Sequence, residues 1–191
     1  KVGEMNDLRI PYAVEYLDYL GTSKMTAEAV KAKFYNLACR YNISSSDKET
    51  TITLSGLADN SGKALQLLMN LIQQAQPDTN ALNNVIADVL KQRHDAKSNQ
   101  TNVMNCLRTY SEYGPELVNY QLKNEQLQAL TDAELIACLK QLLQYKPEIL
   151  YYGPASLKQV KSMLSANYKM PKQFATPAPA KDFKLLPTPK N

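Results

Sequence analysis

Histidine is nearly absent from this sequence, which has a single one, His94, among 191 residues. Zinc hydrolases commonly take metal ligands from histidine, and serine hydrolases use it as a base. His94 cannot supply a two-histidine zinc site, and no G-x-S-x-G motif gives a serine to which it could be paired. No G-x-x-x-x-G-K motif offers a phosphate-binding loop either. The composition therefore argues against these common catalytic centres.

Cysteine is also sparse, and the three residues Cys39, Cys106 and Cys138 lie far apart in the chain. No C-x-x-C pair predicts a zinc site, and an odd number argues against a disulfide framework. We expect buried thiols that behave as small apolar side chains. A single disulfide in an oxidising compartment is the alternative.

Long apolar runs and clusters of basic residues are missing as well. No run approaches the ~20 apolar residues that span a bilayer. The net charge of +4 is modest, and the basic residues are scattered apart from a few lysines near the C-terminus. Nucleic-acid binders concentrate Lys and Arg on one face. We therefore expect neither a membrane span nor a nucleic-acid partner.

The apolar periodicity predicts an α+β fold, in which a small, mostly antiparallel sheet packs against several helices. Changes between helical spacing and strict alternation separate the elements. We expect helices at about 11–20, 26–39, 61–74, 78–96, 101–113, 131–143 and 156–168. Thr26 can cap the second of these helices, and Thr131 with Glu134 forms a capping box for the sixth. Alternation predicts strands at 41–45 and 51–55, joined as a hairpin near 46–48, and a short strand at 149–152.

Two segments follow from this pattern. Residues 1–169 form the α+β domain, and residues 170–191, which are rich in proline and lysine, form an extended linker toward a following domain. A hairpin and one strand make a thin sheet for so many helices. Either further strands escape the pattern, or the domain is truncated at its N-terminal edge and lacks part of its sheet.

The first helix carries the most informative pattern, Tyr-Ala-Val-Glu-Tyr at 12–16, followed by Leu-Gly-Thr at 20–22. Tyr12, Glu15, Tyr16 and Tyr19 share one face at i, i+3, i+4 and i+7 spacing, beside an apolar stripe. A helix that is apolar or aromatic over most of its circumference is usually buried. Glu15 is therefore expected in a protected place, where it needs a partner.

This pattern resembles the pitrilysin/insulinase family of zinc metallopeptidases, and in particular the large bacterial members with four tandem homologous domains. The family carries H-x-x-E-H on a helix, in which two histidines hold zinc and the glutamate is the general base. The segment 12–16 fits this frame with both histidines replaced by tyrosine. In the family, a later helical segment ends in the third zinc ligand, a glutamate. The segment 82–88 is similar to it, and the resemblance would put Asp88 at the position of that ligand. The segment 149–154 resembles the close of such a domain, so the resemblance covers about residues 1–190.

The resemblance implies a catalytically inactive domain, most like the third of the four. Zinc and the general base would lie in an active domain elsewhere in the parent chain. The partners would be the other homologous domains and the peptide substrate, enclosed in a chamber that this domain helps to form. A periplasmic or cell-envelope location is implied by the large bacterial members. Two alternatives are a structural or assembly subunit without a proteolytic role, and an active metalloenzyme with a rebuilt site.

The vestigial site implied by the resemblance consists of Tyr12, Glu15, Tyr16 and Asp88, with no metal and no catalytic residue. Tyrosine ligates zinc only as phenolate, which its pKa near ~10 makes costly at neutral pH. One hypothesis is a cluster in which the tyrosine hydroxyls donate hydrogen bonds to Glu15 and Asp88. The alternative is that both tyrosines are core aromatics and Asp88 is solvated.

Overall fold

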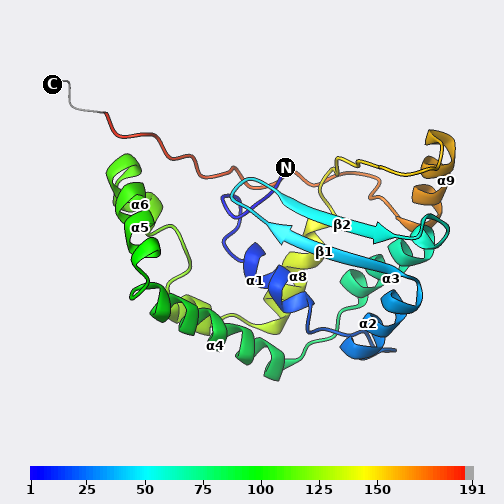
Figure 1. Cartoon of the computed structure of the whole chain (residues 1–191), viewed down its shortest axis with the longest axis horizontal. Coiled ribbons are helices and arrows are strands. Elements are labelled where there is room, and N and C mark those ends of the chain that lie inside the picture. The colour runs from blue at the N-terminus through cyan, green and yellow to red at the C-terminus, as the bar shows by residue number, and fades with distance from the viewer. Residues whose placement is uncertain (188–191) are drawn as a thin grey trace.

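Helices pack against a two-stranded antiparallel sheet, which confirms the predicted α+β class (Figure 1). The computed structural model describes residues 1–187. Within these residues, no helix combines the length and the apolar character that crossing a bilayer requires.

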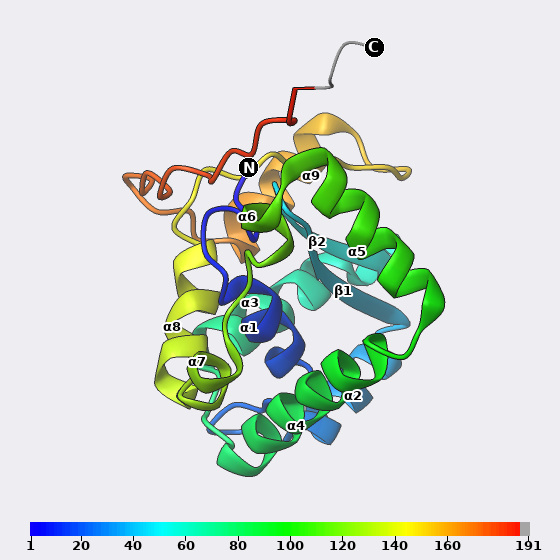
Figure 2. The same ribbon diagram turned by 90° about the vertical axis from the view of Figure 1, so that its left-hand side faces the viewer.

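Helix α1 (Ile10–Leu17) lies at the centre of the fold, with a proline in its first turn and five of its eight residues buried. It contacts α8 (Asp132–Leu142), α4 (Thr79–Ala96) and the sheet. Figure 2 shows it between α8 on one side and the hairpin on the other. The apolar stripe predicted for this helix therefore packs into the main core.

The sheet is the predicted hairpin, formed by β1 (Cys39–Ser45) and β2 (Thr50–Gly56), with Ile43 opposite Ile52. Helix α2 (Ala27–Asn36) precedes it and is N-capped by Thr26, as predicted. It was predicted to continue to Cys39, which is wrong. Ala38 adopts a positive φ of 48°, which ends the helix and turns the chain into β1.

The remaining elements are short connections and longer helices. Capping boxes begin α8 at Thr131 and α9 at Ser156, and the first was predicted from its sequence. Two short helices, α6 and α7, lie between residues 113 and 131, where the sequence predicted no helix or strand. The elements are η1 (Ala58–Asn60), α3 (Ser61–Gln74), α5 (Gln100–Tyr113), α6 (Pro115–Val118), α7 (Asn124–Gln128) and α9 (Leu157–Asn167).

The strand predicted at 149–152 does not form, although the segment has the composition of a strand. Among residues 1–187, none of its backbone groups pairs with another segment. Leu150 and Tyr152 are almost fully exposed, while the Tyr151 hydroxyl accepts a hydrogen bond from the backbone of Ala155. A strand needs a neighbour for its ladder, and the described part of the chain offers none here.

The C-terminal segment from residue 170 to 187 contains no helix or strand. It runs across the molecule, and its backbone N–H groups donate to carbonyls at three well-separated places: Ala175 to Gln144, Lys181 to Met5 and Leu186 to Glu112. Its role as a linker to a following domain stays a prediction. The end of that predicted linker, residues 188–191, lies outside the described residues.

The three cysteines are unpaired thiols, of which Cys39 and Cys138 are buried. Cys106 is exposed, so the expectation of a buried thiol was wrong there. It lies on α5, which buries none of its residues against the described part of the chain.

Candidate functional site

The candidate site is the face of α1 that carries Tyr12, Glu15 and Tyr16. Their i, i+3, i+4 spacing puts the three side chains on one side of the helix. Helix α4, which carries Asp88, packs against α1. The fold therefore brings together the two helices on which the four predicted residues lie.

Tyr16 is completely buried, and its hydroxyl connects three elements. It accepts a hydrogen bond from the backbone N–H of Asp78, the N-cap residue of α4, at 2.8 Å. It donates a hydrogen bond to the carboxylate of Asp132, at the start of α8. Burial first, and then the hydrogen bond to Asp132, raise the pKa of Tyr16 well above its usual value. The hydroxyl therefore stays protonated and joins α1 to α4 and α8.

Tyr12 is half-buried against the core and points toward a different part of α4. Its hydroxyl accepts a hydrogen bond from Nη2 of Arg93 at 2.9 Å. Nη1 of the same guanidinium donates to Oδ1 of Asn124, on α7, at 2.8 Å. Burial raises the pKa of Tyr12, although the charge of Arg93 opposes this. Arg93 thus links the first tyrosine to both α4 and α7.

Glu15 and Asp88 lie between these two links and are both exposed. The expectation that Glu15 sits in a protected place was wrong. Partial desolvation raises the pKa of Glu15, and the negative charges of Asp88 and Asp18 add to the effect. The charge of Asp88 thus acts on Glu15, and both carboxylates remain accessible to water.

The hypothetical tyrosine–carboxylate cluster is not the arrangement that forms. Among the described residues, no hydrogen bond joins Tyr12 or Tyr16 to Glu15 or Asp88. Asp78 and Asp88 are ten positions apart, about 15 Å along the axis of α4, so the Tyr16 hydroxyl is directed well away from Asp88. The alternative interpretation, core aromatics and a solvated Asp88, describes the site better.

The donor set does not fit a catalytic zinc ion. The Tyr12 hydroxyl already contacts a guanidinium, whose permanent positive charge would repel a second cation. The Tyr16 hydroxyl is engaged elsewhere, and its raised pKa opposes the phenolate that a metal would need. In the part of the chain that the structure describes, no group of three His, Cys, Asp or Glu residues could hold a metal. His94 lies exposed on α4 and joins no such group.

Three residues of this network escaped the sequence analysis. Arg93 is one of the scattered basic residues and belongs to no motif, but it is half-buried and its guanidinium bonds to both Tyr12 and Asn124. Asp132 and Asn124 are 116 and 31 positions from their partners, so no local pattern pairs them. The capping box at Thr131 did place Asp132 in the first turn of α8, which was the one available signal.

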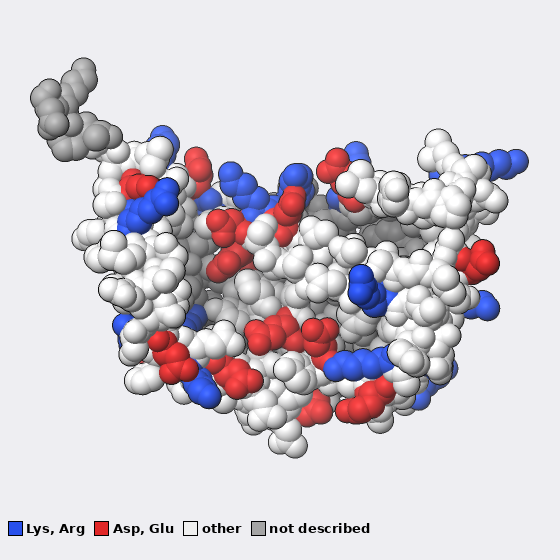
Figure 3. All heavy atoms as spheres, in the orientation of Figure 1, with Lys and Arg blue, Asp and Glu red and all other residues white. Residues whose placement is uncertain are grey.

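On the face seen in Figure 3, lysine and arginine side chains are scattered among acidic and uncharged residues rather than gathered in one patch. This face therefore lacks the dense basic stripe of nucleic-acid-binding proteins.

The chain was compared with family models, curated protein sequences and solved structures. No protein-family model and no curated protein sequence matches the chain. The periplasmic protease PqqL from Escherichia coli matches with a TM-score of 0.74 and 12% identity, over 96% of this chain and 21% of PqqL. The ferredoxin protease FusC, solved with Arabidopsis ferredoxin, matches with a TM-score of 0.70 and 13% identity, over 96% of this chain and 21% of FusC.

A third match is the inactive domain of an M16 peptidase from Pseudomonas fluorescens, with a TM-score of 0.59 and 17% identity over 71% of this chain and 34% of that one. The chain spans about one-fifth of PqqL and of FusC. Identities this low establish the fold alone. The resemblance to pitrilysin/insulinase-type peptidases is thus confirmed at the level of structure, and the chain has the fold of an M16 peptidase domain.

Proposed function

We propose that this chain is a non-catalytic domain of a zinc metalloprotease. It helps to form the chamber that encloses the peptide substrate, and it supports an active domain located elsewhere in the parent chain. The observation that carries the proposal is α1 itself. Tyr12 and Tyr16 stand at the positions that the family resemblance assigns to the two zinc-binding histidines, and in this M16-type fold their hydroxyls bind Arg93 and Asp132.

Three observations support an architectural role for the domain. Hydrogen bonds from Tyr12 and Tyr16, the first through Arg93, link α1 to α4, α7 and α8, so this helix serves to connect its neighbours. The fold spans only about one-fifth of two proteases with which it aligns almost completely. An M16 inactive domain shares it. We propose zinc for the active domain, and a periplasmic or envelope location by likeness to PqqL.

The first test is metal content. The purified chain is dialysed against excess zinc, then against metal-free buffer, and analysed by elemental analysis. We expect far less than one zinc per chain, because the donor set is engaged in hydrogen bonds. One tightly held zinc per chain would contradict the proposal, and Asp88 and His94 would be the first residues to substitute.

The second test uses the parent protease. Glu15→Gln removes the carboxylate that occupies the position of the general base, so peptidase activity should be unchanged if this domain does not catalyse. A loss of kcat of about 100-fold or more, as expected when a general base is removed, would identify the domain as catalytic instead. Deletion of residues 1–169 from the parent should abolish activity if the domain supports the chamber, and retained activity would argue against that role.

A further inference from the structure

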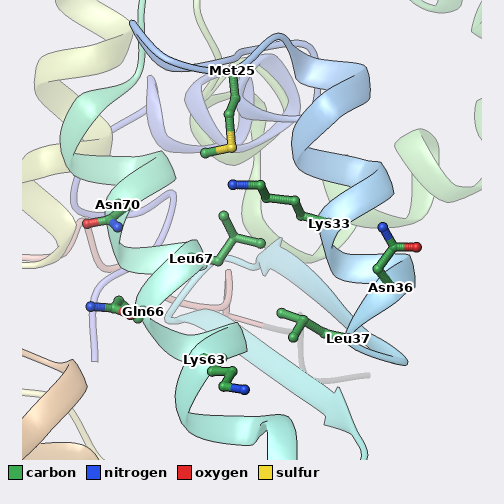
Figure 4. Close-up of a pocket in the computed structure, with 8 residues that line it drawn as sticks. All are labelled: Met25, Lys33, Asn36, Leu37, Lys63, Gln66, Leu67 and Asn70. Carbon is green, nitrogen blue, oxygen red and sulfur yellow. The ribbon is translucent and has the colours of Figure 1, made fainter.

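A groove of about 360 Å³ lies between α2 and α3, on a different part of the molecule from the tyrosine links. Its residues recur at helical spacing: Lys33 and Asn36 from α2, Leu37 just after it, Lys63, Gln66, Leu67 and Asn70 from α3, and Met25 from the loop before α2. Figure 4 shows Lys33 reaching from α2 toward Met25 and Leu67, while Leu37 points from the end of α2 toward α3. Its volume lies within the range of small-ligand sites.

The groove carries positive charge that nothing in its lining neutralises. Two of its eight lining residues are lysines, and none is acidic. Within residues 1–187, neither Lys33 nor Lys63 forms an ion pair. A concave site with two unpaired ammonium groups attracts an anion, since the curved protein wall reduces screening by water.

The uncharged residues of the lining indicate which kind of anion the groove would favour. Leu67 is buried and Met25 and Leu37 are half-buried, so the floor is apolar and favours a ligand with an apolar body. Asn36, Gln66 and Asn70 each present both an N–H donor and a carbonyl acceptor. Such pairs match the N–H and C=O groups of a peptide backbone. A free phosphate would leave the apolar floor unused, and a fatty acid has no N–H donor to offer the exposed carboxamide oxygens.

We propose that this groove binds the free C-terminal end of an apolar peptide. The terminal carboxylate lies between Lys33 and Lys63, the apolar side chains contact the Met25–Leu37–Leu67 floor, and the carboxamides pair with the backbone. This rests on the proposed function, because it identifies a place where the non-catalytic domain would hold a peptide. It does not require the domain to contact an active site.

The test measures binding to the 191-residue chain by fluorescence anisotropy. The probe is a tetrapeptide of alternating alanine and leucine, labelled at its N-terminus and carrying a free C-terminal carboxylate. We expect saturable binding that is weakened about tenfold or more when the C-terminus is amidated, since charge-assisted hydrogen bonds to the carboxylate are then lost. NMR shift changes should concentrate on α2 and α3.

Matched variants locate the charge effect. The double substitution Lys33→Gln/Lys63→Gln should weaken the free acid about tenfold and leave the amide unaffected. The control Lys91→Gln/Lys97→Gln removes the same charge from exposed positions on and beside α4 and should leave both affinities unchanged. Circular dichroism confirms that both variants fold.

Several outcomes would overturn the proposal: no binding of the free acid at millimolar concentration, equal affinity for acid and amide, equal effects of the two double variants, or shift changes outside α2 and α3. Competition by inorganic phosphate or laurate at lower concentration than by the unlabelled peptide would assign the groove to a different ligand. Failure here leaves the zinc and Glu15→Gln results untouched, so it is distinguishable from failure of the proposed function.

Discussion

The hydroxyl of Tyr16, on α1, donates a hydrogen bond to the carboxylate of Asp132, on α8, across 116 positions of sequence. The Asp132 carboxylate also accepts from the Thr79 hydroxyl, at the start of α4, through its other oxygen at 3.0 Å. A single buried phenol thereby aligns the beginnings of two helices against α1. This makes Tyr16 a structural residue, and its contribution to stability can be measured.

Removing the Tyr16 hydroxyl should destabilise the domain. Tyr16→Phe keeps the ring in the core but leaves the Asp78 N–H and one Asp132 oxygen without this partner. We expect the free energy of unfolding to fall by about 1–3 kcal/mol, measured by urea denaturation. Tyr19→Phe is the matched control, because Tyr19 is 48% exposed and should change stability by less than about 0.5 kcal/mol. Equal effects of the two substitutions would show that the Tyr16 contacts contribute nothing specific.

The pair formed by Tyr12 and Arg93 can be tested with a double-mutant cycle. Tyr12→Phe, Arg93→Met and the double variant should give a coupling energy of about 0.5–1.5 kcal/mol, because each loses the hydrogen bond between the two side chains. Arg93→Met also loses the hydrogen bond to Asn124, and the cycle subtracts that contribution. A control cycle combines Tyr12→Phe with Lys91→Met. In that cycle the two changes in the free energy of unfolding should add to within about 0.5 kcal/mol. Additivity in the first cycle would mean that the hydroxyl and the guanidinium do not interact in solution.

Stability should decline in alkaline solution because of Tyr41. Burial first, and then the negative charge of Asp18, raise the pKa of Tyr41 from 10.0 to about 12. Between these values the unfolded state has released the proton that the folded state keeps, so stability falls as the pH rises. Unfolding in urea at a series of pH values from about 8 to 12 measures this.

Tyr41→Phe separates this residue from other groups that titrate in the same range. The variant should lose less stability between pH 10 and 12 than the unmodified chain does, because it has no phenol to ionise when unfolded. Identical pH profiles would exclude Tyr41 as the source. The buried Tyr16, with its raised pKa, should add to the decline in both proteins.

The three thiols should differ in reactivity. Cys106 is exposed on α5, whereas Cys39 and Cys138 are buried. Burial chiefly raises the pKa of the Cys138 thiol to about 12, which leaves very little reactive thiolate at neutral pH. An Ellman assay on the folded chain should therefore show one fast thiol and two that react only on unfolding. Cys106→Ser should remove the fast phase, and a fast phase that survives would mean that a buried cysteine becomes accessible.

The sequence determined the elements whose signals are local. Side chains three or four positions apart meet on a helix whatever surrounds it, so the apolar spacing of α3 and α4 predicted those helices closely. The capping box at Thr131 uses only residues within one turn, and it forms as predicted. The hairpin likewise pairs strands that are adjacent in sequence.

Tertiary structure decided everything that depends on distant partners. The segment 149–152 has the residues of a strand, but a strand exists only where another backbone lies beside it, and none does among residues 1–187. The sequence predicted Tyr12, Glu15 and Tyr16 on one helix, and all three lie on α1. It could not show that the hydroxyls would bind Arg93 and Asp132, because those partners are brought near only when α4 and α8 pack around α1.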